Sequence, residues 1–214
     1  MKPGLRVIMI NKDTKIYCSF SSNPGNNGCI FFNDEFERNG IDAIYKSFYS
    51  DDIKKSIEAV KSLGIKGFAL SMPFKIEALD YVDEVEDSAK KIGSINTVVN
   101  KGGYLKGYNT DWIGVKKYFE IRRFDSIYII GNGGFSKAVQ YTCNVMDIGF
   151  VIITRENWNI IEELEDKIIF NATPVDINTD NFLIDGRPHT DTGREIALYQ
   201  AKEQFKIYTG VEID

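Results

Sequence analysis

The fold of this chain is decided by one stretch of sequence, Ser126-Ile127-Tyr128-Ile129-Ile130-Gly131-Asn132-Gly133-Gly134-Phe135-Ser136-Lys137-Ala138. Its first five residues form a compact apolar run, which is typical of a buried strand. The run enters a glycine-rich turn directly, and a helical pattern continues from Phe135 to about Met146. This order predicts a phosphate-binding turn, because a helix N-terminus offers free N–H groups and the positive end of its dipole to an anion.

Each small residue of the turn has an expected part. Gly131 allows the sharp bend, Gly133 lets a pyrophosphate approach the backbone, and Ser136 stands where a third glycine is usual. A simple tight turn is the alternative interpretation. The elements that follow argue against it, because they complete half of a dinucleotide-binding fold. They are a strand, a helix and a further strand: Phe150–Thr154, Trp158–Glu165 and Lys167–Asn171.

The end of the strand at Phe150–Thr154 indicates which cofactor the turn would take. An acidic residue there usually binds the ribose 2′-hydroxyl of NAD, whereas a basic residue accommodates the 2′-phosphate of NADP. This chain has Thr154-Arg155 at that place, which favours NADP. Glu156 follows immediately, and its charge would oppose a phosphate if it pointed the same way.

Short apolar runs and helical patterns also alternate on the N-terminal side of this unit, as in an α/β protein with mainly parallel strands. Asp51-Asp52 begins a helix that ends at Gly64. After it we expect a strand at Gly67–Leu70 and a helical stretch after Pro73 that carries the solvated acidic run Asp80–Asp87. A strand at Ser94–Asn100, a tight turn at Lys101–Tyr104 and a returning strand at Tyr104–Tyr108 should follow, and then a helix at Asp111–Glu120. Toward the C-terminus, the polar segment Asn178–Thr192 predicts a loop and Arg194–Tyr208 a helix.

Composition limits the class of protein. The 214 residues carry 26 Lys and Arg against 31 Asp and Glu, a net charge of −5, and 43% are hydrophobic. Such a chain can build a core of one or two domains, and its mildly acidic balance argues against a nucleic-acid-binding surface. The apolar run Val7–Ile10 is shorter than the roughly 7–15 residues of an export signal, and no window approaches the roughly 20 apolar residues of a membrane span.

The three cysteines, Cys18, Cys29 and Cys143, are odd in number and show no C-x-x-C spacing. We therefore expect free thiols in a reducing cytoplasm. A zinc site is not expected, because His189 is the only histidine.

Two further stretches carry residues with proton-transfer chemistry. Lys75 ends the sequence Ser71-Met72-Pro73-Phe74-Lys75, and Asp111 ends Asn109-Thr110-Asp111. In a cleft, a lysine and an aspartate would form a coupled acid–base pair. Periodicity alone favours a simpler interpretation, in which Asp111 is a helix N-cap and Lys75 a surface lysine.

At this point the sequence resembles the shikimate dehydrogenase family over most of its length. The resemblance rests on six blocks that occur in the order of the family: Gly67–Lys75, Ile92–Val99, Gly107–Gly114, the glycine turn, Asn171-Ala172-Thr173-Pro174, and Gln200-Ala201 with Phe205 and Thr209-Gly210. It implies an N-terminal α/β substrate-binding domain at residues 1–110 and a shortened Rossmann-type NADP-binding domain at 111–193. The C-terminal helix at 194–214 would pack back on the first domain.

The resemblance also implies an activity, the reversible NADP-dependent reduction of 3-dehydroshikimate to shikimate in aromatic amino-acid biosynthesis. Lys75 would transfer the proton at the reacting oxygen, with Asp111 as its hydrogen-bonded partner. The residues implied to hold substrate hydroxyls are Ser71, Asn96 and Gln200. Those implied to bind NADP are Gly131, Gly133, Gly134, Phe135 and Ser136 at the pyrophosphate, Thr154 and Arg155 at the ribose phosphate, and Asn171, Thr173 and Pro174 near the nicotinamide.

Three departures from the family bear on this expectation. The two serines that bind the substrate carboxylate in the family fall on Asn26 and Gly28, of which Asn26 can still donate a hydrogen bond. Asp176 stands where members have glycine near the nicotinamide. Between Val175 and Thr192 the chain lacks a strand, a helix and a substrate-binding tyrosine.

These departures leave alternatives open. The substrate could be a relative of shikimate, a related cyclic keto acid. A different class of function is a catalytically impaired paralogue that binds a nucleotide or small molecule in a regulatory role. A folate-linked dehydrogenase of similar architecture lacks support from the Asn-Thr-Asp motif. We expect a small-molecule substrate, no nucleic-acid or membrane partner, and a monomer or homodimer.

Overall fold

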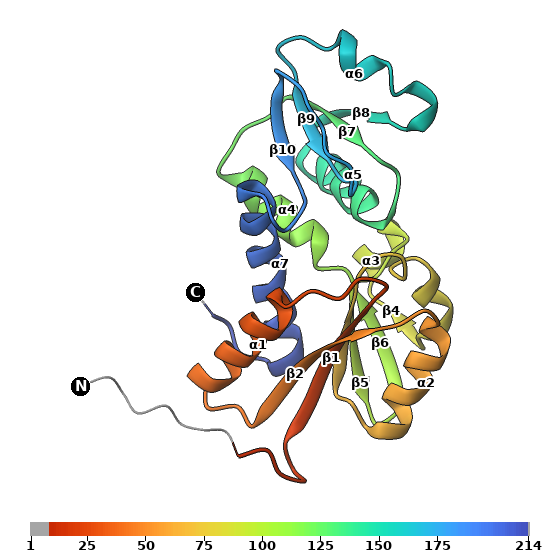
Figure 1. Cartoon of the computed structure of the whole chain (residues 1–214), viewed down its shortest axis with the longest axis vertical. Helices are drawn as coiled ribbons and strands as arrows, with labels where there is room; N and C mark the ends of the chain where they lie inside the picture. Colours follow the sequence, from red (N-terminus) through yellow and green to blue (C-terminus); the bar gives the residue numbers. More distant parts are fainter. Residues whose placement is uncertain (1–8, 214) are drawn as a thin grey trace, which may run out of the picture.

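The computed structural model describes residues 9–213 and contains two β-sheets, each covered by helices (Figure 1). Helices and strands alternate along the chain, so the expectation of an α/β protein is confirmed. Part of the apolar run Val7–Ile10 lies outside the described residues. No helix within 9–213 is long and apolar enough to cross a membrane.

The first sheet has six strands in the order β2-β1-β3-β5-β6-β4. Their bounds are β1 Lys15–Ser21, β2 Ala43–Tyr49, β3 Gly67–Leu70, β4 Glu84–Val85, β5 Thr97–Lys101 and β6 Tyr104–Tyr108. β1 pairs in parallel with β2 and β3, and β4 pairs in parallel with β6. β5 runs antiparallel to both of its neighbours, because the predicted glycine turn joins it to β6, with positive φ at Gly102 and Gly103.

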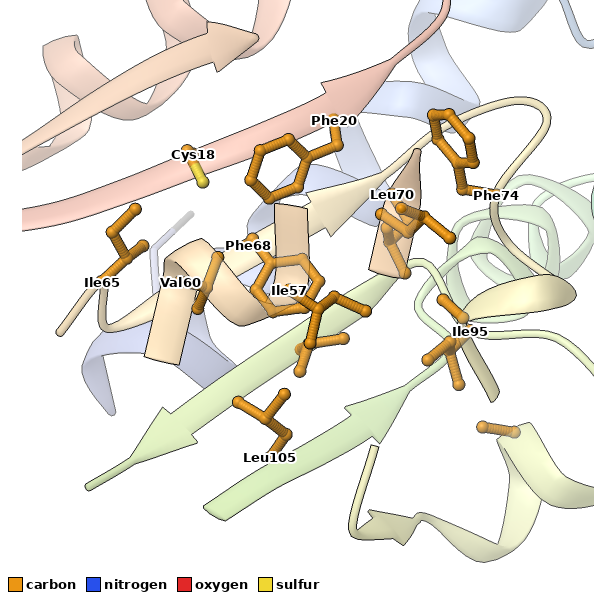
Figure 2. Close-up of a cluster of buried hydrophobic side chains, with 14 residues drawn as sticks. Cys18, Phe20, Ile57, Val60, Ile65, Phe68, Leu70, Phe74, Ile95 and Leu105 are labelled. Atoms are coloured by element: carbon orange, nitrogen blue, oxygen red, sulfur yellow. The ribbon is translucent and has the colours of Figure 1, made fainter. Parts of the chain in front are cut away.

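Helices pack on both faces of this sheet. On one face lies α2, Ile53–Leu63, which Asp52 caps and Gly64 ends in the left-handed conformation, as predicted. Its apolar side chains meet those of β1, β3 and β5 in the core drawn in Figure 2, around Phe68. On the other face, α1, Asn27–Arg38, packs Phe32 and Phe36 against the sheet.

The second sheet has four strands, all parallel, in the order β10-β9-β7-β8. These strands are β7 Ser126–Ile130, β8 Gly149–Ile153, β9 Ile168–Asn171 and β10 Phe182–Asp185. Helix α5, Gly134–Met146, follows β7 directly and packs on one face. The opposite face carries the short helix α6, Ile160–Glu163.

Two helices connect the sheets: α4, Asp111–Glu120, and α7, Asp191–Thr209. They pack against each other between the upper and lower sheets in Figure 1. Ile196, near the start of α7, belongs to the core of the second sheet. Phe205 and Tyr208, near its end, belong to the aromatic core of the first sheet.

Two sequence-based predictions are wrong in these regions. The stretch after Pro73 is not one helix: it forms a 3-10 turn at Glu77–Tyr81, then β4, then helix α3 at Asp87–Ile92. The reason is tertiary, since Val82 and Val85 pack on the first core and the Asp83 carboxylate accepts a hydrogen bond from Leu105 N at 2.7 Å.

The segment Asn178–Thr192 is not wholly a loop, because it contains β10. Only four residues long and flanked by polar side chains, this strand gives little periodicity to detect. Ile184 nevertheless lies fully buried in the second core, and β10 pairs residue by residue with β9. The ten residues between these parallel strands form no helix, which is short for a parallel crossover.

Smaller differences concern the ends of elements. The strand expected from Ser94 begins at Thr97. Before it, the Ile95 N–H donates to Lys75 O at 2.8 Å, and the side chains of Ser94 and Asn96 bond Gly134 and Asp111. The helix expected at Trp158–Glu165 is shortened to α6, after a 3-10 turn at Arg155–Asn157.

Candidate active site

Lys75 and Asp111 meet where the two halves of the chain join. Lys75 follows β3 and the cis Met72–Pro73 bond, and Asp111 is the first residue of α4. The Lys75 ammonium Nζ donates to Asp111 Oδ2 at 2.5 Å, and the two side chains are only 18% and 6% exposed. The simpler interpretation is therefore wrong on both counts. Lys75 is not a surface lysine, and the residue at the N-cap of α4 is Thr110.

Asn96 fixes the second oxygen of this aspartate. Its amide Nδ2 donates to Asp111 Oδ1 at 2.9 Å and to Thr110 Oγ1 at 3.0 Å. Its carbonyl Oδ1 accepts from the Thr110 backbone N–H at 2.8 Å and from Thr97 Oγ1 at 2.9 Å. Because Asn96 is 3% exposed and bonded at both ends, the network positions the Asp111 carboxylate toward Lys75.

Helix α7 supports the same network from the opposite side. Gln204 Nε2 donates to Thr97 Oγ1 at 2.7 Å, and Gln204 is itself buried. Gln200, one turn earlier on α7, is half-buried and donates to Gln204 Oε1 at 3.5 Å. The structure thus places Gln200 on the helix face that leads toward Asn96.

The glycine turn of the second half touches the lysine of the first. A Cβ added to Gly134 would lie 3.1 Å from the Cβ of Lys75, so the backbone of α5 passes directly over the lysine. Ser94 Oγ donates to the carbonyl oxygen of Gly134 at 3.1 Å. The ring of Phe135 lies 5.6 Å from Lys75 Nζ, within cation–π range. The proton-transfer pair and the predicted phosphate turn therefore share one site.

The turn itself has room for an anion. Gly131 has φ +106° and is contacted by Thr173, so no side chain fits there. Ser136 Oγ closes the turn with a bond to Gly131 O at 2.6 Å. Gly133, by contrast, has an ordinary φ of −84° and no atom within 4 Å of an added Cβ. Open space at the N-terminus of a 13-residue helix fits a pyrophosphate.

The other predicted cofactor residues lie along the carboxyl ends of the second sheet. Thr154 follows β8 and caps a 3-10 turn, which leaves Arg155 exposed beside it. Asn171 ends β9, and its side chain organises the next segment by accepting from Thr173 N at 3.0 Å and donating to Val175 O at 2.9 Å. Pro174 is exposed in that segment. Ligands of parallel α/β sheets bind at this edge.

Ser71 and Asn26 are the predicted substrate residues that the structure leaves outside the buried network. Ser71 is exposed just after β3, and its backbone N–H donates to Phe20 O at 3.1 Å. Asn26 is exposed at the N-cap of α1 and makes no side-chain capping bond. Both side chains are accessible from solvent, whereas Lys75 and Asp111 are nearly covered.

Sequence reasoning missed an arginine at the carboxyl end of β10. The guanidinium of Arg187 bonds the carboxylate of Asp185 through Nε at 3.0 Å and Nη2 at 2.6 Å, and its Nη1 bonds Asp176. Burial alone would raise the pKa of Asp185, but hydrogen bonds from Arg187 outweigh it and lower that pKa. The conflict between Asp176 and the nicotinamide stays a prediction, and the Asp176 side chain is 93% exposed and paired with Arg187.

The network around the aspartate was also only partly foreseen. Asn96-Thr97 and Asn109-Thr110 are two copies of one dipeptide, and such a repeat of buried polar pairs was the available signal. Asn109 donates to the Ser94 carbonyl at 2.9 Å, which ties the second copy to the first. No group of three or more His, Cys, Asp and Glu side chains within the described range is arranged to hold a metal ion. All three cysteines are free thiols, as predicted.

Comparison with known proteins shows what the chain is similar to. Residues 28–98 match the family model described as the shikimate dehydrogenase substrate binding domain. The NADP(+) shikimate dehydrogenase of Pyrococcus furiosus is 36% identical, in a match that covers 96% of this chain and 94% of the relative. That match is 259 residues long, whereas the whole of this chain has 214, so the relative carries residues that this chain lacks.

Two further similarities extend the comparison. A shikimate dehydrogenase-like protein of Haemophilus influenzae is 42% identical over 134 residues, which are 61% of this chain but 49% of that protein. A crystal structure of a shikimate dehydrogenase in complex with NADP+ superimposes with a TM-score of 0.80 at 28% identity. It covers 96% of this chain and 93% of the other, so the likeness includes both sheets.

Proposed function

This chain belongs to the shikimate dehydrogenase family, and we propose that it catalyses the reversible NADP-dependent reduction of 3-dehydroshikimate, or a related cyclic keto acid, to shikimate in aromatic amino-acid biosynthesis. The observation that carries the proposal is the nearly buried pair of Lys75 and Asp111 beside the glycine turn. The P. furiosus relative bears this activity in its name.

Lys75 holds the proton that the reaction needs at the substrate oxygen. In the reducing direction its ammonium group donates a proton to the carbonyl oxygen, and in the oxidising direction neutral Lys75 accepts the hydroxyl proton. Asp111 holds the lysine nitrogen in place, and Asn96 holds Asp111. Such general acid–base help typically contributes about 10²–10⁴-fold in rate.

The cofactor site follows from the second sheet. NADP, when bound, supplies or takes up the hydride. The turn at Gly131, Gly133, Gly134, Phe135 and Ser136 would hold the pyrophosphate, with Thr154 and Arg155 at the ribose phosphate and Asn171, Thr173 and Pro174 toward the nicotinamide. A solved relative of the same fold is in complex with NADP+, which supports NADP as the cofactor.

Substrate contacts and cellular context complete the proposal. Ser71, Asn96, Gln200 and Asn26 would contact the substrate, and Asn96 would also position Asp111. The domain division at residues 1–110 and 111–193 is consistent with the two sheets, and α7 would return to the first domain. Free thiols at all three cysteines support a reducing cytoplasm, where the protein would act as a monomer or homodimer.

A steady-state assay tests the activity directly. Purified protein is given shikimate with NADP or with NAD, and the formation of reduced cofactor is followed by absorbance. We expect turnover with NADP, and we expect Arg155→Gln to weaken NADP binding about tenfold or more while NAD binding stays unchanged, because only NADP carries the 2′-phosphate. Quinate and other cyclic hydroxy acids test the alternative substrates.

The regulatory alternative predicts a different result. Tight NADP binding in a thermal-shift assay, without turnover of shikimate, quinate or close analogues at any pH, would refute the proposed activity. A ligand at 100 times its Kd stabilises a protein by about 2.7 kcal/mol, so binding is detectable even without catalysis.

A further inference from the structure

Arg187 pairs with two carboxylates in very different surroundings. The Asp185 side chain is 8% exposed, and it accepts the Nε and Nη2 donors of the guanidinium together. Asp176 bonds the remaining Nη1, and its side chain is 93% exposed. The first pair is fixed, whereas the second is a surface ion pair, which is weak and easily exchanged.

The position of Arg187 in the fold points to a ligand. It follows β10 by two residues and lies at the carboxyl edge of the second sheet, where the neighbouring Gly186 N–H donates to Asn171 O at 3.0 Å. Its side chain is only 15% exposed. A largely covered arginine with one donor facing an exposed partner can bind an anion there without repacking.

The ring of Phe135 links this arginine to the proton-transfer lysine. A Cβ added to Gly186 would lie 2.4 Å from Phe135 Cε1, so the backbone before Arg187 rests on that ring. The same ring lies 5.6 Å from Lys75 Nζ. The backbone next to Arg187 and the Lys75 ammonium group therefore both lie beside the ring of Phe135.

The order of strands decides which anion reaches Arg187. Under the proposed function, the pyrophosphate lies at the turn after β7 and the ribose phosphate at the end of β8. In the order β10-β9-β7-β8, β10 is the edge opposite β8. The ribose phosphate is thus placed at the edge opposite Arg187, and β9 separates Arg187 from the turn of the pyrophosphate. The remaining anion is the carboxylate of the substrate.

We propose that Arg187 binds the carboxylate of the substrate, and that Asp176 occupies Nη1 of Arg187 until the substrate carboxylate replaces it. Asp185 holds the guanidinium in one orientation throughout. The step is an exchange of ion pairs and forms no covalent bond. The proposal rests on the proposed function, because that function supplies a cyclic acid as the ligand.

Two substitutions test this exchange. Asp176→Asn removes the competing charge but leaves the buried Arg187–Asp185 pair intact, so the variant should fold normally. Arg187→Lys keeps the positive charge but loses the planar fork that binds a carboxylate. The exposed pair Arg194–Asp191, with side chains 62% and 94% exposed, offers Asp191→Asn as the matched control.

The probes are shikimate and its uncharged methyl ester, with binding measured by calorimetry in the presence of NADP and KM measured separately. We expect Asp176→Asn to tighten shikimate binding about 2- to 5-fold, as loss of a competing surface ion pair allows. We expect Arg187→Lys to weaken it about tenfold or more, because the bidentate contact is lost. Neither variant should change the affinity for the ester, and Asp191→Asn should leave the affinity for both ligands unchanged.

Equal effects of Arg187→Lys on the acid and on the ester would overturn the proposal and leave Arg187 a structural residue. An effect on NADP affinity alone would assign the arginine to a cofactor phosphate instead. Failure of the native protein to bind shikimate would also overturn it. Binding without turnover, still dependent on Arg187, would refute the proposed activity but keep the carboxylate site, so the two failures are distinguishable.

Discussion

The Lys75 ammonium group is positioned by a chain of side chains, not by one contact. Asp111 gives one carboxylate oxygen to Lys75 and the other to Asn96, and Asn96 in turn is held by Thr97 and Thr110. Since every member except the lysine is buried, a rotation of Asp111 would leave polar atoms unpaired at a cost of about 1–3 kcal/mol each. The orientation of the pair is therefore fixed before any ligand binds.

Removal of the lysine should affect chemistry more than binding. We expect Lys75→Ala to lower kcat by about 10²–10⁴-fold with a small change in KM, because the lost group acts on the proton. Stopped-flow and steady-state kinetics with shikimate and NADP measure this. Lys90→Ala, at an exposed position on α3, is the control and should keep full activity. A change in KM alone would assign Lys75 to binding.

At the level of elements, the contact between α4 and α7 depends on one glycine. A Cβ at Gly114 would lie 2.6 Å from Ile196 O and 3.0 Å from the Cβ of Gln200. The two helix backbones can approach this closely because no side chain separates them. This approach brings Gln204 within reach of Thr97.

Gly114→Ala should therefore push α7 away from α4. We expect a loss of about 1–3 kcal/mol in the free energy of unfolding, typical of overpacking a tight contact. Chemical denaturation measures the loss. Gly25→Ala, where an added Cβ meets no atom within 4 Å, should leave stability unchanged or slightly raised. Equal stabilities of the two variants would contradict the proposed close packing.

The end of β10 should make stability depend on acidity. The pKa of Asp185 lies below its ordinary value of 3.8 in the folded protein, because hydrogen bonds from Arg187 outweigh the opposing effect of burial. A lowered carboxyl pKa stabilises the fold above the unfolded-state pKa, and this stabilisation is lost as the pH falls through the folded-state value. The pair thus strengthens the fold at neutral pH and not in acid.

We expect Asp185→Asn to destabilise the protein at about pH 7 but less at about pH 3, because pH 3 lies below the ordinary carboxyl pKa of 3.8 and part of the stabilisation is lost once the unfolded chain takes up the proton. Urea denaturation at both pH values measures the difference between native and variant proteins. Asp80→Asn, at an exposed position, is the control and should show a small difference at either pH. If the difference in the free energy of unfolding between native protein and variant stays the same in acid, Asp185 acts through packing alone.

The elements themselves followed from the sequence to different degrees. Helix α2 was predicted to the residue because Asp52 and Gly64 mark its two ends locally. The strands β4 and β10 were missed because each is short and lies among polar residues, and each is held by pairing with another strand 14 to 22 residues away. A local sequence pattern reflects interactions within a few residues, whereas these two strands depend on pairing outside that range.

At the scale of the whole molecule, α7 belongs to both halves. Its N-terminal part packs Ile196 into the second core, and its C-terminal part packs Phe205 into the aromatic core between α1 and the first sheet. Phe205 is fully buried and lies 5.6 Å from Phe36, ring centre to ring centre. The last helix in sequence therefore stabilises the first elements of the chain.

Truncation of that side chain should weaken the first half. We expect Phe205→Ala to cost about 3–5 kcal/mol, as is usual for a buried aromatic ring, with a lowered Tm. Phe205→Leu, which keeps most of the volume, should cost much less. Hydrogen exchange should show the extra opening in β1 and β2 more than in the second sheet. A loss of protection from hydrogen exchange that is confined to the second sheet would contradict this role of α7.

The sequence by itself determined the α/β class, the glycine turn between a strand and a helix, and the two residue types suited to proton transfer. These are local features, since capping, periodicity and glycine conformations act within a few residues. Only the tertiary structure decided that Lys75 and Asp111 are covered together, that Asn96 and Gln204 support the pair, and that Arg187 holds Asp185 and Asp176 at the end of β10. The contacts around the pair join residues 15 to 107 positions apart, and those of Arg187 lie in a segment without periodicity. Chain closure over such distances depends on the packing of the whole molecule.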